Sequence, residues 1–443
     1  MKIIREYKID ILIFLAFLGF TLLLPNNVSI WTDELFTLEF VELSVPESLK
    51  ETALDIHPPL YYLVVKLFVN LFPFVDMAIL GKFVSLFIFF AFLLITYHYI
   101  KKYINDSIAS TYAIVAMGCK ILHYCFEIRM YTLATSLIVL AYISGYLLVT
   151  TKKHRFAIYT NICVLLAMYT HYYAVFAILP LFLYLVVSLC KEKEYKVLLL
   201  SICFQIVAYL PWLIYFMSLL SNNQSGFGTG YYLSLSNLIT YIVVLFSNGN
   251  KILTAITMCF YLLIVVIAFK RSRYKDVCFA FICISSVISI FIFGNILGFV
   301  FDKFFSGKYL LLGWNTFVFG ICLILNDVKC RKQFIVGIIA LNVFTYLYAI
   351  KDEITDIIET NNFVEFINDQ NDVTCIGKYS DLCEYYSENN VLILENNDIS
   401  ITTEYVILNE KIDDLEVDFY SPAQVNMYVY KTSKYNQYVN NLR

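Results

Sequence analysis

The chain has 443 residues, of which 60% are hydrophobic and 15% are charged, and its mean hydropathy is +0.70. A soluble globular protein of this length does not have such a composition, which excludes a water-soluble enzyme and predicts a polytopic α-helical membrane protein. The net charge of −3 conceals an asymmetry, because residues 351–443 carry a net charge of −12 and residues 1–350 about +9, which predicts that the two parts face different environments.

Residues 9–24 form the first apolar run, and a basic start precedes it, as in a signal peptide. The segment that follows, Leu24-Pro25-Asn26-Asn27, lacks the small-residue pattern of a cleavage site. We therefore expect an uncleaved first helix over about 8–25. The later apolar runs, at 83–100, 252–269 and 277–300, also reach or approach the ~20 residues that span a bilayer core.

Basic clusters alternate with acidic or uncharged segments between the apolar runs. Residues 26–56 are acidic and 221–235 are uncharged, whereas the basic clusters lie at 2–8, 101–102, 152–155, 191–196, 270–275 and 329–332. Because basic loops tend to stay in the cytoplasm, this pattern predicts a cytoplasmic N-terminus and an extracytoplasmic acidic tail in the cell membrane.

This orientation limits the number of crossings. Only one crossing, at about 79–100, fits between the first outer loop (26–78) and Lys101-Lys102, so the apolar stretch 57–72 is expected to be an in-plane or re-entrant helix. The same reasoning makes 236–247 a partial element. Eleven spans result, of which the others lie at about 107–123, 130–150, 156–170, 173–190, 197–217, 251–269, 277–298, 309–326 and 333–350.

The acidic tail, 351–443, is predicted to be a small α/β domain that follows a membrane part formed by 1–350. Short strands are expected at 373–376, 391–394, 405–408 and 426–430, and a short helix at 381–388. None of the twelve cysteines has metal-ligand spacing. Cys375 and Cys383 are candidates for a disulfide if the tail faces an oxidising compartment, and the sequence leaves this pairing open.

Polar residues gather at the predicted outer helix ends. They are Asp33, Glu34, His57, Lys82, His123, Glu127, Arg129, His171, Lys303 and Lys308. Most have a structural explanation: Asp33 and Glu34 suit a helix N-terminus, and Glu127 with Arg129 suits capping and snorkelling. His171 also fits a satisfied interhelical histidine, and we interpret His123 and Lys303 as structural.

The combination of these residues favours one chemistry. A carboxylate can take the proton of an acceptor hydroxyl, and cations can hold the charge of a departing phosphate. A carboxylate and cations at one membrane surface therefore indicate group transfer from a lipid-linked phosphate donor, with Arg129 as the cation best suited to a phosphate because its fork binds it bidentately.

At these positions the chain resembles bacterial GT-C-fold glycosyltransferases, in particular the group related to protein O-mannosyltransferases and aminoarabinose (lipid A) transferases. The resemblance covers about 1–350 and depends on the order and spacing of several motifs. They are Asp33-Glu34, His57-Pro58-Pro59-Leu60-Tyr61-Tyr62, Glu127-Ile128-Arg129-Met130-Tyr131, Thr170-His171-Tyr172-Tyr173 and Lys308-Tyr309-Leu310-Leu311.

The resemblance implies a GT-C-like membrane module with juxtamembrane helices in its first outer loop, and inverting transfer of a sugar from a polyprenyl-phosphate donor. It implies Asp33 as general base and Glu34 as its support. Arg129 would face the donor phosphate or an active-site carboxylate, and His57 would line the donor or acceptor cavity. The other candidate substrate-binding residues are Lys82, Glu127, Tyr131, His171 and Lys308. Lys82 and Lys308 stand where such proteins usually carry Arg, which weakens their case as bidentate phosphate ligands.

Other functions remain open on the sequence alone. A flippase, transporter or polymerase of lipid-linked glycans is also polytopic, although a transporter usually places ionisable residues near mid-membrane. An adaptor with an acidic tail would leave the outer polar residues without a role. No cofactor is indicated with certainty, since Asp33 and Glu34 are a thin site for a divalent metal. The predicted partners are the polyprenyl-phosphate sugar, membrane lipids and a glycan, lipid or protein acceptor, but no nucleic acid.

Overall fold

A computed structural model of the chain divides it into two compact units. One contains Met1–Leu23 and Phe40–Tyr346, which we call the helical unit, and the other contains Leu24–Glu39 and Leu347–Arg443, which we call the sheet unit. The structure describes all residues except 1–6, 23, 25–29, 55–56, 118–123, 221–234, 248–249, 270–273, 302–304, 327, 371, 377–382, 384, 388–389, 395–402, 409–410, 413–414, 422–426 and 443.

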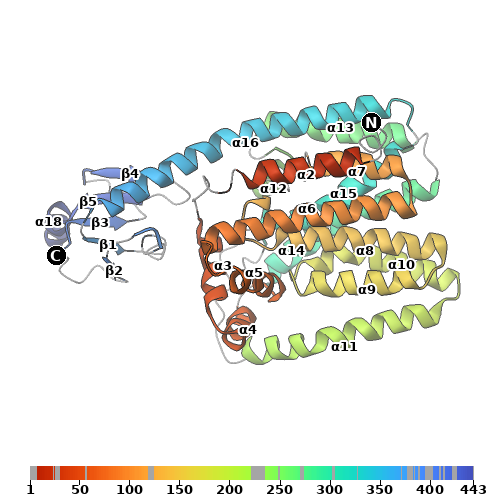
Figure 1. Cartoon of the computed structure of the whole chain (residues 1–443), viewed down its shortest axis with the longest axis horizontal. Coiled ribbons are helices and arrows are strands. Elements are labelled where there is room, and N and C mark those ends of the chain that lie inside the picture. The colour runs from red at the N-terminus through yellow and green to blue at the C-terminus, as the bar shows by residue number, and fades with distance from the viewer. Residues whose placement is uncertain are drawn as a thin grey trace. The chain divides into compact units, whose positions relative to one another are not determined.

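Long apolar helices build the helical unit (Figure 1). In chain order the elements of this unit are α2 (Lys8–Thr21), α4 (Val45–Leu54), α5 (Leu60–Leu71), α6 (Met77–Tyr103), α7 (Asp106–Met117), α8 (Tyr131–Thr151), α9 (Arg155–Met168), α10 (Ala174–Lys191), α11 (Tyr195–Leu220), α12 (Leu235–Ser247), α13 (Lys251–Phe269), α14 (Tyr274–Phe301), the 3-10 helix η3 (Gly307–Gly313) and α15 (Trp314–Leu325). The long helix α16 (Arg331–Asn368) begins here and ends in the sheet unit.

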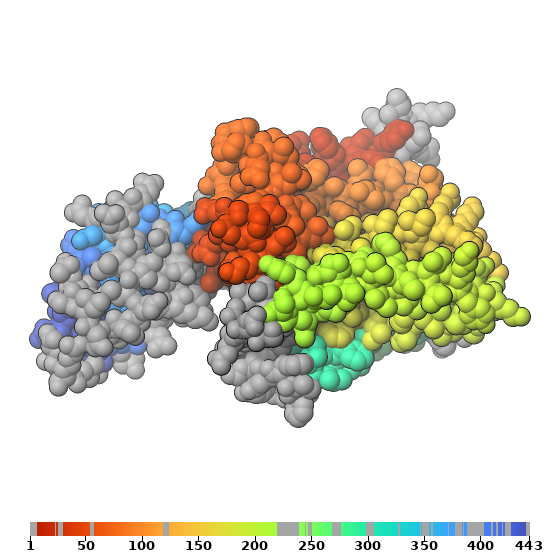
Figure 2. Space-filling model, turned by 90° about the horizontal axis from the view of Figure 1, so that it is seen from below, coloured from red at the N-terminus to blue at the C-terminus, as the bar shows by residue number. Residues whose placement is uncertain are grey.

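Six helical segments within the described residues are long and apolar enough to cross a membrane. Among them, α8 and the η3–α15 segment are almost wholly buried, whereas α11 is almost wholly exposed. Figure 2 shows α11, in yellow-green, along the surface of this unit. A helix that exposes apolar side chains on most of its faces is suited to contact with lipid. The chain is thus a multi-pass membrane protein, and the count of eleven crossings stays a prediction.

Short helices lie at one end of the long ones, where α5 packs against α6 and α4 against α11 (Figure 1). The twelve-residue α5 and the thirteen-residue α12 are too short to span a bilayer, as expected for 57–72 and 236–247.

The charged residue Lys66 lies in the apolar helix α5, and backbone carbonyl groups bind its charge. Its Nζ donates to the carbonyls of Val41, at 2.6 Å, and Leu43, which lie at the C-terminal end of the helix that precedes α4.

The C-terminal part of the sheet unit is a five-stranded mixed sheet in the order β2-β1-β3-β5-β4. β1 pairs in parallel with β2 and β3, and β5 pairs antiparallel with β3 and β4. Val406 and Tyr430 are adjacent across β3 and β5, and they pack with Ile376 and Tyr435 in a buried core. The strands are β1 (Asp372–Ile376), β2 (Asn390–Leu394), β3 (Tyr405–Leu408), β4 (Phe419–Ser421) and β5 (Met427–Lys431), followed by α18 (Thr432–Leu442).

The small α/β character of the tail is confirmed, with strands at all four predicted positions. The sequence did not predict β4 or α18, because β4 has only three residues and α18 is polar overall. The predicted helix at 381–388 lies partly outside the described residues, although Cys383, Tyr385 and Tyr386 are helical.

Two thiols of the sheet unit are buried side by side. Cys375 and Cys383 are both free and 1% exposed, and the two thiols are close enough to interact. The pairing that the sequence left open is therefore a thiol–thiol contact in this structure. Burial raises the pKa of the Cys375 thiol well above its usual value, and the neighbouring Cys383 thiol adds to the increase.

We expect Cys375 to resist alkylation in the folded protein at pH 8, because the thiolate is the reactive form and a raised pKa keeps the thiol protonated. Iodoacetamide labelling followed by mass spectrometry should modify Cys375 at least ~10-fold more slowly in the reduced, folded protein than in urea. Equal rates in the two conditions would contradict the buried position.

Candidate functional site

Two histidines from distant parts of the chain meet in the helical unit. His57 directly precedes Pro58 and Pro59 at the start of α5, and His171 lies in the connection between α9 and α10. The Leu60 N–H donates to the carbonyl oxygen of Tyr169 at 3.0 Å, which ties the two segments together. The His57 and His171 rings then lie with their centroids 5.0 Å apart.

Two tyrosines complete this group of rings. The Tyr309 ring, from η3, lies 4.9 Å from the His171 ring, and the Tyr131 ring, from the first residue of α8, lies 5.9 Å from it. We call the four rings of His57, Tyr131, His171 and Tyr309 the histidine cluster. Since each comes from the end of a different element, the cluster lies where several helices begin.

His171 carries a donor that is available to a ligand. Its Nδ1 accepts the N–H of Tyr173 at 3.2 Å, so a neutral ring carries its proton on Nε2. That Nε2 is buried and has no hydrogen-bond partner among the described residues. Burial lowers the pKa of His171 well below its usual value, and electrostatic interactions with His57 and Arg129 lower it further. The ring is therefore a neutral donor.

Two cations of the helical unit are buried. Lys82 is 2% exposed and Arg129 is 3% exposed. A Cβ atom on Gly81 would come within 2.8 Å of Ile128, which shows that the start of α6 packs against the segment that carries Arg129. Because Arg129 acts electrostatically on His171, this segment also belongs with the histidine cluster.

Glu127 and Lys308 lie beside the same rings. Glu127 is half-buried. Burial raises the pKa of Tyr124, and the Glu127 charge adds to the increase; the Tyr124 ring is 5.4 Å from the Tyr131 ring. Lys308 is half-buried in η3 and directly precedes Tyr309. Six of the predicted substrate-binding residues thus lie in or beside the histidine cluster: His57, Glu127, Arg129, Tyr131, His171 and Lys308. The seventh, Lys82, lies in the first part of α6.

Asp33 and Glu34 belong to the other compact unit. They occupy the first turn of α3 (Thr32–Glu42), a helix that is divided between the two units after Glu39. The Glu34 carboxylate accepts the N–H of Trp31 at 3.2 Å, as in one half of a capping box, and Glu34 is 2% exposed. Asp33 is half-buried, and its backbone oxygen accepts a bond from Thr37 at 3.0 Å. The helix-start interpretation of this pair is therefore correct for Glu34.

Sequence reasoning gave Tyr309 and Tyr173 no role of their own, although both stand within quoted motifs. The Tyr173 ring lies 4.5 Å from that of Tyr309, which holds η3 against the start of α10. The sequence feature that could have indicated them is their place in the chain: Tyr309 directly follows Lys308, and Tyr173 lies two residues after His171. His123 and Lys303 lie outside the described residues. Within those residues, no group of three or more His, Cys, Asp or Glu has the arrangement of a metal site.

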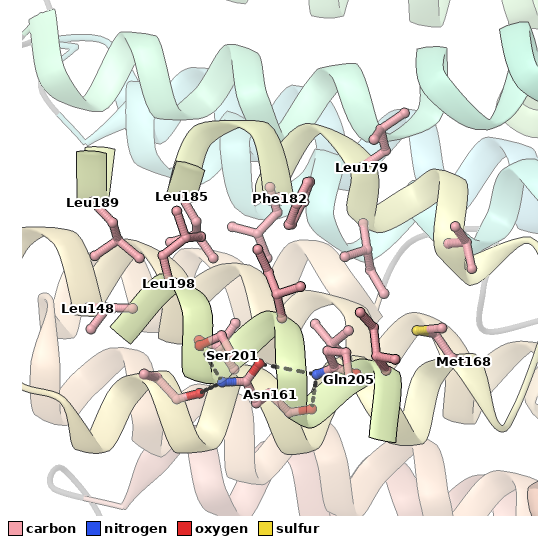
Figure 3. Close-up of a pocket in the computed structure, with 18 residues that line it drawn as sticks. Leu148, Asn161, Met168, Leu179, Phe182, Leu185, Leu189, Leu198, Ser201 and Gln205 are labelled. Atoms are coloured by element: carbon pink, nitrogen blue, oxygen red, sulfur yellow. Dashed lines mark hydrogen bonds between the residues drawn. The ribbon is translucent and has the colours of Figure 1, made fainter. Parts of the chain in front are cut away.

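A separate cavity of about 260 Å³ lies among α8, α9, α10 and α11 (Figure 3). Its walls are mostly aliphatic, and its polar side chains are uncharged. Asn161 Nδ2 donates to Ser201 at 2.8 Å, and Gln205 Nε2 donates to the Asn161 carbonyl oxygen at 2.8 Å. These bonds satisfy polar groups between apolar helices. With no titratable group in its lining, the cavity offers no acid, base or phosphate ligand.

Comparison with solved structures defines the class of fold as the GT-C type found in membrane glycosyltransferases. Two of the similar structures are of ArnT from Cupriavidus metallidurans. The apo structure has a TM-score of 0.57 and 10% identity, and the match covers 94% of this chain and 97% of ArnT. The structure bound to undecaprenyl phosphate has a TM-score of 0.54 and 10% identity, and the match covers 82% of this chain and 72% of ArnT. By sequence, the chain matches no protein-family model and no curated protein.

We expect Gly81→Ala to destabilise the protein, because the new methyl group would overlap the branched side chain of Ile128, and overpacking typically costs ~1–3 kcal/mol. The apparent unfolding temperature in detergent should fall by several degrees. Gly19→Ala is the control, since a Cβ at Gly19 would have nothing within 4 Å. Equal behaviour of the two variants would contradict the close packing of α6 on the 127–129 segment.

Proposed function

We propose that the protein is an inverting glycosyltransferase that moves a sugar from a polyprenyl-phosphate donor to an acceptor at the outer face of the membrane. The observation that carries this proposal is the burial of Arg129 beside the histidine cluster in a GT-C-type fold. The likeness to an ArnT structure bound to undecaprenyl phosphate supports a lipid phosphate as the ligand of this cluster.

The cations suit the leaving group of the reaction. When the bond between the sugar and the phosphate breaks, the departing polyprenyl phosphate gains negative charge. Arg129 offers a planar fork of donors for two phosphate oxygens, and Lys82 and Lys308 offer positive charge. The proton on His171 Nε2 adds a neutral donor, which stabilises an anion without itself titrating. His57, Glu127 and Tyr131 line the same region and would contact donor or acceptor.

Asp33 is the proposed general base. Its carboxylate would take the proton from the acceptor hydroxyl as the hydroxyl oxygen attacks the anomeric carbon, opposite the departing phosphate, which inverts that carbon. Glu34 supports Asp33 by capping the first turn of α3 through the Trp31 N–H. The orientation with the N-terminus in the cytoplasm and the tail outside is part of this proposal, as is the assignment of 1–350 to catalysis.

A transporter or flippase of lipid-linked glycans is the other candidate. Such proteins bind near the bilayer midplane, often at broken helices. Here His57 precedes α5, Arg129 precedes α8 and His171 precedes α10. Placement of the ionisable groups at helix ends supports group transfer over transport through the bundle.

We expect Asp33→Asn to abolish transfer and to preserve donor binding, because the amide cannot accept the acceptor proton. The transfer rate from polyprenyl-phosphate sugars should fall by ~10²–10⁴-fold. Glu39→Gln, an exposed carboxylate on the same helix, is the control and should retain the wild-type rate. Wild-type transfer by Asp33→Asn would exclude Asp33 as the base.

We expect Arg129→Gln to weaken the binding of undecaprenyl phosphate by ~10–100-fold, because a charge-assisted hydrogen bond contributes ~1.5–3 kcal/mol. Arg129→Lys should fall between wild type and Arg129→Gln, since lysine keeps the charge but loses the fork. Native mass spectrometry measures the affinity, and Arg155→Gln, which removes an exposed arginine of the same unit, is the control. Unchanged affinity in Arg129→Gln would remove this residue from the donor site.

A further inference from the structure

One tyrosine hydroxyl in the sheet unit holds both backbone groups of Ile30. The Ile30 N–H donates to the Tyr386 hydroxyl at 2.6 Å, and that hydroxyl donates to the Ile30 carbonyl oxygen at 2.7 Å. The two residues are 356 positions apart in the sequence, and Ile30 is 1% exposed. Because buried backbone groups need partners, the Tyr386 hydroxyl is a structural requirement for this segment.

Tyr386 is in turn held by the framework of the C-terminal part. Its carbonyl oxygen accepts a bond from Asn368 Nδ2 at 3.3 Å, and Asn368 is the last residue of α16. The Ser387 N–H donates to the Cys383 carbonyl oxygen at 3.1 Å, and Cys383 contacts Cys375 of β1. The hydroxyl that binds Ile30 therefore projects from a segment fixed to α16 and to the sheet.

Ile30 lies directly before the first turn of α3. The next residue, Trp31, accepts the N–H groups of Glu34 at 2.8 Å and Leu35 at 3.0 Å, and its own N–H is bound by the Glu34 carboxylate. The start of α3 is thus fixed from within by Glu34 and from outside by Tyr386. Asp33 lies between these two anchors, three residues after Ile30.

We propose that Tyr386 is a positioning residue that fixes the start of α3, and through it the Asp33 carboxylate, to the C-terminal sheet. The C-terminal part then acts in the reaction by holding the proposed base. This inference rests on the proposed function, since it requires Asp33 to be the base. Tyr386 acts only through the backbone of the Asp33 segment and does not touch substrate.

The test compares Tyr386→Phe with Tyr385→Phe in the full-length protein in lipid nanodiscs. Tyr385 is the adjacent residue of the same helical segment, and its ring lies 5.3 Å from that of Tyr386. In Tyr386→Phe, amide hydrogen exchange in the peptide that spans 30–36 should rise by ~10-fold or more, because the buried hydrogen bonds of Ile30 are lost. Tyr385→Phe should exchange as the wild type does.

Kinetics separate positioning from stability alone. Tyr386→Phe should lower kcat for sugar transfer by ~10-fold or more, because a small displacement of a catalytic group is costly. The affinity for undecaprenyl phosphate should stay within ~2-fold, because the donor-binding residues are untouched. Asn368→Asp, which loses the donor to the Tyr386 carbonyl oxygen, should change exchange and kcat in the same direction by a smaller factor. If Tyr386→Phe fails to fold, the exchange and kcat of Asn368→Asp test the positioning role of Tyr386 instead.

A double-mutant cycle with Asp33→Asn completes the test. If Tyr386 acts through Asp33, adding Tyr386→Phe to Asp33→Asn produces no further loss of kcat. Additive losses, or a rise in exchange without a fall in kcat, would overturn the positioning role. Unchanged exchange in Tyr386→Phe would overturn the anchor itself. Failure of the proposed function is distinguishable, because it appears as wild-type transfer by Asp33→Asn alone, whatever the exchange shows.

Discussion

Ionisable side chains inside an apolar helical bundle need a polar environment, and in this chain they find it where the helices begin and end. His57, Lys82, Arg129 and His171 are each at most 3% exposed. At a helix end, backbone groups without intrahelical partners and neighbouring side chains can solvate a buried charge, which lipid cannot do. The histidine cluster, the packing of Gly81 against Ile128 and the position of η3 all follow from gathering these side chains at one set of ends.

The residues of the proposed function belong to two compact units. The helical unit contains the cations and the neutral His171 donor that suit a phosphate, whereas Asp33 belongs to the unit that contains the sheet. Hydrogen bonds fix the segment that carries Asp33 within its own unit. They join the Tyr386 hydroxyl to the backbone of Ile30, and the Trp31 N–H to the Glu34 carboxylate.

Sequence patterns predicted the elements with a strong local signal. Apolar runs predicted α6, α8, α10, α11 and α14, and short alternating segments predicted β1, β3 and β5. The last apolar run predicted a helix that ends at about 350, because the hydropathy of the sequence falls there. In the structure the same helix, α16, continues without a break to Asn368. The grouping of Leu24–Glu39 with the C-terminal part was also not expected. The hydrogen bonds of Ile30 to the Tyr386 hydroxyl use its backbone N–H and carbonyl oxygen, which leave no mark on the pattern of side chains in its segment.

The sequence by itself determined that this is a membrane protein, that its polar residues stand at helix ends and that its tail is a small α/β fold. Periodicity and charge contain that information, because each reports a residue's local environment. Only the tertiary structure decided that His57, Tyr131, His171 and Tyr309 form one cluster, and that Tyr386 holds the segment before Asp33. These contacts join residues up to 356 positions apart, and packing between distant elements creates them.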